Sequence, residues 1–326
     1  MTKPSPKIVY MGSPDFAVRP LQVLLEAGFN VVGVITAPDR PAGRGKKIRQ
    51  SAIKEFLLNE EKDIALLQPE KLKDPFFIEE LTTLRPDLQV VVAFRMLPEV
   101  VWSIPPMGTI NLHASLLPQY RGAAPINHVL INGELETGVT TFFLDEQIDT
   151  GKILLQERIS IAADETAGEL HDRLMELGAE LVLLTVRQIS EGQIEAMAQD
   201  HFLDSGIGLN QAPKIFKEDC RIDWNLDGEK IFNLIRGLSP HPGAFTFLVK
   251  EKGDQVLCKI FSATFEEKLQ PNAPGSISIN GKKSLEVAVK NGVIGILSIQ
   301  QEGKRKMDIK DFLAGFSLRN EVSRFF

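Results

Sequence analysis

Three polar side chains with complementary chemistry stand out in the sequence. Asn111 and His113 lie two residues apart in GTINLHASLLP, which reads as a strand followed by a loop, and Asp149 precedes a Thr-Gly turn in DEQIDTGKI. Side chains two apart on a strand point to the same face. A buried amide and a buried imidazole are costly unless both find partners. We therefore expect this strand end to serve chemistry rather than packing.

An amide donor, an imidazole and a carboxylate are the groups that acylation of an amine requires. The amide and a protonated imidazole can hold the oxyanion of a tetrahedral intermediate, while the carboxylate orients the imidazole and helps to remove a proton. Each residue alone is a weak signal, because a single His near a strand end is more often structural and Asp-Thr-Gly is a common turn. The sequence has no Ser-centred nucleophile elbow and no Cys with a nearby His, so covalent catalysis has little support.

The elements that must position these residues alternate between strand and helix. Continuous apolar, β-branched runs at 7–11, 31–36 and 88–94 suit parallel strands that are buried on both faces. Further strands are predicted after the Asn/His strand, at 138–144 and 152–161. Helical patterns lie between and after them, at 20–28, 51–61, 74–84 and roughly 166–190. The order predicts an α/β fold with a Rossmann-like wound sheet, whose sites lie at the carboxyl ends of strands. His113 and the loop after it lie at such an end.

The length of 326 residues suggests more than one domain. We predict a catalytic domain at 1–190 and a connection at 191–209, where hydrophobic periodicity is lost. Residues 210–326 begin with a helix near 227–237 and continue as short β-rich runs separated by turn signals such as NAPG and KNG. This pattern predicts a small antiparallel β-barrel, of the OB-like kind.

Composition is that of an ordinary soluble globular protein, with 43% hydrophobic and 25% charged residues. The first residues carry no apolar run of signal-peptide length, and no window approaches the ~18 apolar residues of a membrane span. Two cysteines, Cys220 and Cys258, rule out a disulfide scaffold. The five His residues show no pair at metal-ligand spacing, so no metal site is expected. A reducing cytoplasm is the compartment that we predict.

Charge is distributed unevenly along the chain. Residues 1–209 hold 19 Lys and Arg against 29 Asp and Glu, a net −10, whereas residues 210–326 hold 18 against 14, a net +4. This asymmetry allows a polyanion to lie on the second half, although chance variation between two solvated surfaces is an alternative. The loop PDRPAGRGKKIRQ at 38–50 adds Arg40, Arg44, Lys46 and Lys47, which could contact nucleic-acid phosphates. Its alternative interpretation is a mobile solvated loop.

Several motifs together resemble a known family. NLHASLLP (Asn111 to Pro118), YRGAAP (Tyr120 to Pro125) and DTG (Asp149 to Gly151) resemble the 10-formyltetrahydrofolate-dependent formyltransferases. MGSPDFAV with TAPDRPAGRGKK, and APKIFKEDCRIDW with IRGLSPHPGAF, extend the resemblance over nearly the whole chain. These stretches are similar to the branch of that family that acts on methionine esterified to initiator tRNA. One departure is FRMLP at 94–98, where the family usually has a Tyr-Gly-aliphatic segment that lines the pterin pocket.

The resemblance implies a reaction and its residues. The methionine α-amino group of initiator Met-tRNA would attack the formyl carbon of 10-formyltetrahydrofolate, with no metal or redox cofactor. Asn111 and protonated His113 would stabilise the oxyanion, and Asp149 would hold His113 and assist proton transfer. Folate would pack on Ser115, Leu116, Leu117 and Pro118, and Arg40, Arg44, Lys46 and Lys47 would contact the tRNA.

Two other functions stay open from the sequence. The same catalytic half could formylate a small amine, such as glycinamide ribonucleotide or a nucleotide-linked amino sugar. A different class is an RNA-binding protein with an inactive α/β domain. The intact Asn111, His113 and Asp149 argue against that class.

Overall fold

The structure, a computed structural model, describes residues 5–42, 47–60, 64–202, 208–250, 255–269, 272–281, 283–315 and 322–326. It divides into two compact units, which are described separately. Unit 1 comprises 1–122, 137–159 and 171–211, and unit 2 comprises 123–136, 160–170 and 212–326. The boundary between 170 and 171 falls within one helix, which thus contributes to both units. The sequence boundaries 1–190, 191–209 and 210–326 stay a prediction.

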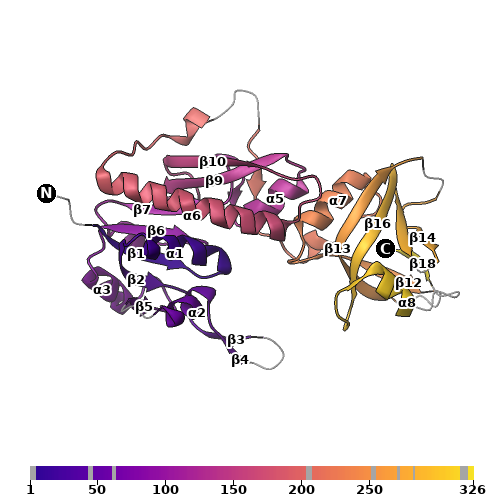
Figure 1. Cartoon of the computed structure of the whole chain (residues 1–326), viewed down its shortest axis with the longest axis horizontal. Coiled ribbons are helices and arrows are strands. Elements are labelled where there is room, and N and C mark those ends of the chain that lie inside the picture. Colours follow the sequence, from indigo (N-terminus) through magenta and orange to yellow (C-terminus); the bar gives the residue numbers. More distant parts are fainter. Residues whose placement is uncertain are drawn as a thin grey trace. The chain divides into compact units, whose positions relative to one another are not determined.

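Unit 1 is built on a seven-stranded sheet of order β10-β9-β7-β6-β1-β2-β5 (Figure 1). Strand β1 pairs in parallel with β2 and β6, β6 pairs in parallel with β7, and β9 is antiparallel to β7. The strands are β1 Lys7–Gly12, β2 Asn30–Ile35, β5 Ala65–Leu67, β6 Leu88–Val92, β7 Thr109–His113, β9 Glu136–Phe143 and β10 Ile153–Ser160. The order reverses on either side of β1, which confirms the predicted Rossmann-like wound sheet.

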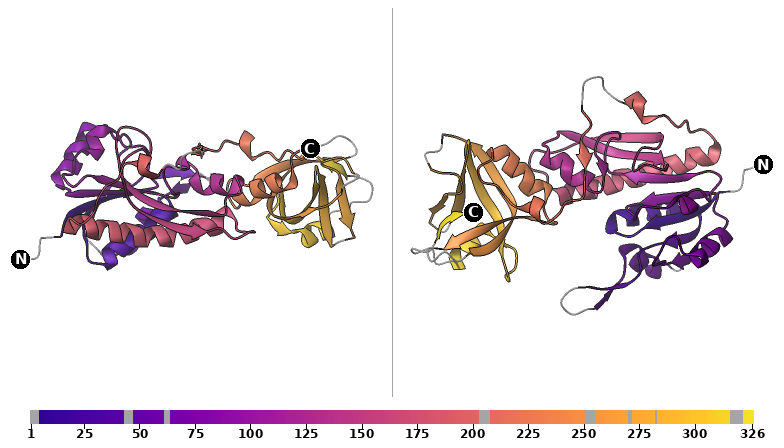
Figure 2. Two further views of the ribbon diagram at one scale, coloured as in Figure 1. Left: turned by 90° about the horizontal axis from the view of Figure 1, so that it is seen from above. Right: turned by 180° about the vertical axis from the view of Figure 1, so that it is seen from behind.

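Helices cover both faces of this sheet, as the view from above in Figure 2 shows. They are α1 Val18–Glu26, α2 Ala52–Asn59, α3 Pro75–Thr83, α4 Glu99–Trp102 and α6 Ala167–Glu191. On one face, Val9 and Met11 share a buried cluster with Phe77 and Leu81 of α3. Alternation along a strand sends the next residues to the opposite face. There α6 packs closely on the sheet, because a Cβ on Gly178 would lie 2.7 Å from the Leu112 side chain.

One strand prediction was wrong at its end, and one short hairpin was not predicted. The strand predicted at 88–94 ends at Val92, because Ala93 adopts a left-handed backbone with φ 46° that breaks the ladder. The basic loop contains two short antiparallel strands, β3 Arg40–Ala42 and β4 Lys47–Arg49. The sequence did not indicate this hairpin. Both differences lie at the edge of the sheet where the strands end.

Unit 2 contains an antiparallel sheet of order β14-β15-β16-β13-β12-β18, with β17 paired to β16. The strands are β12 Ala244–Lys250, β13 Gln255–Glu267, β14 Ile277–Asn280, β15 Ser284–Val289, β16 Gly292–Gln301, β17 Met307–Asp308 and β18 Val322–Phe325. The Phe325 amide donates to the Gly275 carbonyl at 2.9 Å, just before β14, so the two ends of the sheet approach each other. This geometry agrees with the predicted small barrel.

Short helices complete unit 2 around a buried core. Helices α5 Pro125–Ile131, α7 Gly228–Gly237 and α8 Ile309–Gly315 belong to it. The Asn127 amide donates to the Gly237 carbonyl at 2.7 Å, which joins α5 to α7. The remaining short elements of the chain are η1 Asp15–Ala17, η2 Gln199–Phe202, η3 Glu218–Cys220, β8 Arg121–Gly122 and β11 Gln211–Ala212. None of the helices that the structure describes is long and apolar enough to span a membrane.

Candidate active site

Asn111 and His113 lie at the carboxyl end of β7, on one face of the sheet. Asn111 pairs with Val91 of β6, and His113 is opposite Thr140 of β9. His113 is 7% exposed, whereas Asn111 is half-buried. Within the described part of the chain, the Asn111 side-chain amide makes no hydrogen bond. It therefore keeps its donors for a group that enters the site.

Asp149 reaches His113 from the loop between β9 and β10. Its carboxylate Oδ2 lies 3.8 Å from His113 Nδ1 and accepts a hydrogen bond from the Gly122 amide at 2.9 Å. Asp149 adopts a left-handed backbone with φ 55°. Gly151 allows the loop to close, because a Cβ there would lie 1.7 Å from the Phe143 carbonyl oxygen. The Asp-Thr-Gly motif thus has a steric reason as well as a chemical one.

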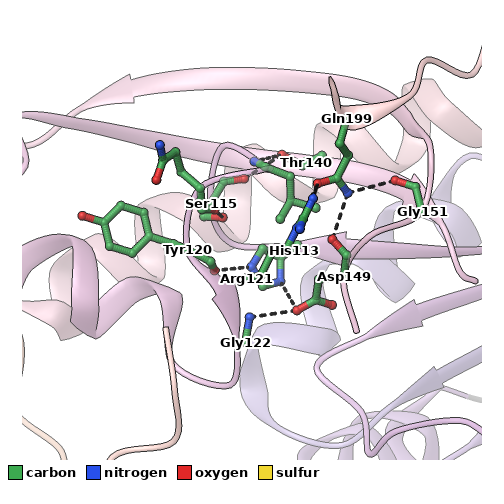
Figure 3. Close-up of polar contacts among 11 residues, drawn as sticks. His113, Ser115, Tyr120, Arg121, Gly122, Thr140, Asp149, Gly151 and Gln199 are labelled. Carbon is green, nitrogen blue, oxygen red and sulfur yellow. Dashed lines mark hydrogen bonds and ion pairs between the residues drawn. The ribbon is translucent and has the colours of Figure 1, made fainter. Parts of the chain in front are cut away.

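The two nitrogens of His113 face two oxygens. Nε2 lies 2.9 Å from the Tyr120 carbonyl oxygen, and Nδ1 faces the Asp149 carboxylate (Figure 3). A carbonyl can only accept, so Nε2 carries a proton in this arrangement. The 3.8 Å between Nδ1 and the carboxylate is longer than a hydrogen bond, so Asp149 lies beside the ring as a neighbouring charge.

A glutamine that was not predicted completes the site. Gln199 is 4% exposed and comes from the segment 191–209. Its Nε2 donates to the carbonyl oxygens of Asp149 (2.8 Å) and Gly151 (2.9 Å). Its Oε1 accepts from Nε (3.1 Å) and an Nη (2.6 Å) of Arg121. The segment 191–209 has no periodic pattern, so no sequence signal indicated this residue.

The SLLP loop turns most of its side chains into the protein. Ser115 is fully buried and its hydroxyl donates to the Gln119 carbonyl at 2.7 Å. Leu117 is 1% exposed, and its amide donates to Thr140 Oγ1 at 3.1 Å. Pro118 is also buried, whereas Leu116 is half-buried. Contact between folate and the side chains of Ser115 and Leu117 is not favoured by this placement.

Two of the four predicted tRNA-binding residues, Arg44 and Lys46, lie outside the described residues. Lys47 is described only as backbone in β4. Arg40 is well exposed, with 71% of its side chain accessible, and its guanidinium lies 3.7 Å from the Glu70 carboxylate. Arg40, whose side chain is described, makes no contact with His113.

The hairpin of β3 and β4 has an anchored base. Lys54 Nζ donates to the Asp39 carboxylate at 2.7 Å and to the Gln68 side-chain oxygen at 2.9 Å. Gln68 Nε2 donates to the other Asp39 oxygen at 2.9 Å. The hydrogen bonds from Lys54 and then Gln68 lower the pKa of the Asp39 carboxyl. The charged loop is thus held at its base by a satisfied polar network.

The unusual FRMLP segment is tied down by Arg95. Its guanidinium donates to the carbonyl oxygens of Pro69 and Glu70 and lies over the Phe94 ring, 5.4 Å from the centroid. Burial, and then the charge of Arg40, lower the pKa of Arg95.

A hollow of about 600 Å³ lies beside the residues that come after Arg95. It is lined by Lys71, Leu72, Lys73, Met96, Leu97, Pro98, Glu99, Trp102 and Glu146. Glu146 belongs to the loop that ends in Asp149.

Comparison with known proteins places this chain in a family. The formyl transferase family matches residues 6–186, and its C-terminal domain matches residues 214–317. The methionyl-tRNA formyltransferase of Bacteroides fragilis is 53% identical over 98% of this chain and 97% of its own length. The chain belongs to the methionyl-tRNA formyltransferase family.

Other relatives agree with that membership. The methionyl-tRNA formyltransferase of Flavobacterium johnsoniae is 49% identical over 97% of this chain and 98% of its own length. An N-formyltransferase from Helicobacter canadensis, solved with folinic acid and dTDP-3-aminofucose, has a TM-score of 0.64 and 20% identity. It covers 92% of this chain and 99% of its own, and at this identity it shows the shared fold alone. Identity of about half over the full length favours the methionyl-tRNA branch over the small-amine branch.

Within the described residues, no group of three or more His, Cys, Asp or Glu side chains is disposed to hold a metal ion. Sequence reasoning missed several main-chain contacts, those of the Tyr120 carbonyl, the Gly122 amide and the Asp149 and Gly151 carbonyls. These residues belong to the motifs YRGAAP and DTG, whereas Gln199 lies in no motif that the sequence indicates.

Proposed function

We propose that the chain transfers the formyl group of 10-formyltetrahydrofolate to the α-amino group of methionyl initiator tRNA, which gives N-formylmethionyl-tRNA for translation initiation. The observation that carries the proposal is the pairing of His113 with Asp149 beside the Asn111 side-chain amide, at the carboxyl edge of the sheet. Full-length identity to methionyl-tRNA formyltransferases supports the choice of acceptor.

The proposed mechanism follows from the positions of three residues. The amine nitrogen forms a bond to the formyl carbon, and the carbonyl oxygen becomes an oxyanion. The Asn111 amide donates to that oxyanion, a kind of contact that in enzymes contributes about 10²–10³ in kcat, and the positive charge of the His113 imidazolium stabilises it. The bond from carbon to N10 of the folate then breaks. Asp149 holds His113, and the proton lost by the attacking amine reaches N10.

The donor needs a hollow beside these residues. Leu97, Pro98 and Trp102 line the hollow of about 600 Å³ at the end of β6, which is large enough for a bicyclic ring. Glu146 also lines this hollow and belongs to the loop that carries Asp149, which supports it as the place of the donor. The SLLP backbone and the half-buried Leu116 would form a neighbouring wall. Folate is a co-substrate here, consumed in each turnover.

The acceptor is an RNA, and we assign two regions to it. Arg40, Arg44, Lys46 and Lys47 would meet phosphates near the acceptor end. Residues 210–326, with net charge +4, would form the tRNA-binding domain after a catalytic domain at 1–190 and a linker at 191–209. A cytoplasmic location follows from this role in translation.

Mass-spectrometric detection of formyl transfer tests the proposal. The purified chain is incubated with methionyl-tRNA, with and without 10-formyltetrahydrofolate, and parallel reactions contain glycinamide ribonucleotide or a nucleotide-linked amino sugar. We expect a formyl group on methionyl-tRNA only when the donor is present. Preferential formylation of either small amine would replace the acceptor assignment. Donor binding without transfer to any acceptor would support an inactive domain.

A further inference from the structure

Gln199 lies in a segment whose sequence suggests only a connection. Its side chain is nevertheless 4% exposed, and its amide group takes part in four hydrogen bonds. All four lead to residues beside the proposed centre (Figure 3). A glutamine amide has two N–H donors and one carbonyl acceptor. It can therefore donate to the carbonyl oxygens of a turn and accept from an arginine side chain at the same time.

The two donors fix the turn that carries Asp149. They bind the carbonyl oxygens of Asp149 and Gly151, which lie on either side of Thr150. Asp149 has a left-handed backbone, which is unfavourable for a residue with a side chain unless its surroundings hold it. The amide of Gln199 therefore supports the backbone conformation from which the Asp149 carboxylate reaches toward His113.

The side-chain oxygen of Gln199 holds β8, the short strand on the other side of the proposed centre. Oε1 of Gln199 binds two nitrogens of Arg121. The neighbouring Gly122 amide donates to Asp149 Oδ2, and the neighbouring Tyr120 carbonyl faces His113 Nε2. One amide group thus bridges the two segments that set the positions of the carboxylate and the imidazole.

We propose that Gln199 is a positioning residue for the reaction, which sets the separation of the Asp149 carboxylate and the His113 ring. The proposal rests on the proposed function, because it assigns to Asp149 and His113 the roles given there. Displacement of a reacting group by about 1 Å can cost roughly 10² in rate. Loss of the bridge should therefore reduce kcat, with little change in the KM for the folate donor.

Two substitutions of Gln199 distinguish its hydrogen bonds to the turn of Asp149 from its hydrogen bonds with Arg121. Gln199→Met keeps the length of the side chain and removes both its donors and its acceptor. Gln199→Glu keeps an acceptor for Arg121 but cannot donate to the turn. If the turn is the important partner, both variants lose about 10²-fold in kcat, and Arg121→Met loses less. Gln89→Met is the matched control, because Gln89 is also a fully buried glutamine but lies near the start of β6.

A double-mutant cycle distinguishes positioning from a purely structural role. In the Asp149→Asn background, Gln199→Met should cause no further loss of kcat, because the carboxylate that it positions is already gone. The pH–rate profile of Gln199→Met should shift toward that of Asp149→Asn, and the Gln89→Met profile should match the unaltered chain. If Gln199→Met does not fold, Gln199→Glu enters the same cycle.

Independent losses that multiply, or an unchanged pH–rate profile at full kcat, would overturn the role of Gln199. Absence of formyl transfer by the unaltered chain would instead count against the proposed function.

Discussion

At the scale of single residues, the proposed mechanism gives Asn111 and His113 different roles toward one oxyanion, a hydrogen-bond donor and a positive charge. We predict that His113→Ala lowers kcat by about 10²–10⁴ and that Asn111→Ala lowers it by about 10²–10³. Steady-state kinetics with methionyl-tRNA and folate donor measure both effects. The Asn111 side-chain amide makes no hydrogen bond within the described residues, so the unfolding temperature of Asn111→Ala should stay close to that of the unaltered chain. A His113→Ala variant within about threefold of the unaltered kcat, below either range, would remove the catalytic assignment.

The contribution of the Asp149 charge can be measured separately from that of its shape, because asparagine has nearly the same shape and no charge. Asp149→Asn keeps an oxygen that can accept from the Gly122 amide, but it loses the negative charge beside His113. We expect slower turnover at neutral pH and an altered pH–rate profile, because a carboxylate stabilises an imidazolium and can accept a proton. The measurement is kcat against pH for both proteins. The same profile and rate in the variant would reduce Asp149 to a turn residue.

At the scale of elements, the sequence predicted the strands and helices that show a periodic hydrophobic pattern. The β-branched runs at 7–11 and 31–36 are strands, and the Asn/His strand lies at a carboxyl edge as expected. The end of β6 was not predictable, because a left-handed backbone at an alanine such as Ala93 leaves no pattern in the sequence. Gln199 was not predictable either. It binds backbone carbonyls about fifty residues away, and such interactions leave no pattern in the sequence.

The base of the basic hairpin carries its own pH-dependent network. We predict that Lys54→Met raises the pKa of Asp39 toward its ordinary value, because the largest cause of the lowered pKa is the Lys54 hydrogen bond. A depressed carboxyl pKa stabilises the folded form above the unfolded pKa, and the effect is lost as pH falls through the folded pKa. Hydrogen exchange of β3 and β4 should therefore differ between the two proteins at neutral pH and converge in acid.

An NMR titration of the Asp39 carboxyl measures this change directly, with Lys7→Met as the control. Lys7 begins β1, and removal of its charge leaves the hydrogen bonds of Asp39 intact. An Asp39 titration that is the same in Lys54→Met and in the unaltered chain would mean that the ion pair does not form in solution.

The hairpin loop itself is predicted to act on tRNA and not on folate. Replacing Arg44, Lys46 and Lys47 by Ala removes charges that could meet phosphates near the acceptor end. The KM for methionyl-tRNA should rise, or kcat should fall if the loop also positions the acceptor, while the KM for the folate donor changes little. Matching tRNA kinetics in the variant and the unaltered chain would make the loop a solvated surface feature.

At the scale of the whole molecule, net charge changes sign along the chain, from −10 in residues 1–209 to +4 in residues 210–326. Deletion of residues 210–326 is a poor test of this asymmetry. Residues 123–136 and 160–170 belong to the same compact unit as 212–326. In that unit Ile131 of α5 packs against Gly237 of α7, so the deletion would expose apolar surface. Single charges on the barrel offer a cleaner measurement.

Lys304 and Arg305 are exposed in the turn between β16 and β17. We predict that their double replacement by Ala weakens tRNA binding and flattens its dependence on salt. For a duplex, removal of one phosphate interaction should reduce the slope of log K against log salt by about 0.9. The matched control replaces Arg173 and Arg187, which are exposed on α6 in the acidic part of the chain. It removes the same charge, so any effect of net charge alone appears in both variants. A larger fall in slope for the barrel variant would locate the RNA-binding surface on residues 210–326, whereas equal falls would mean that the charge asymmetry does not guide tRNA binding.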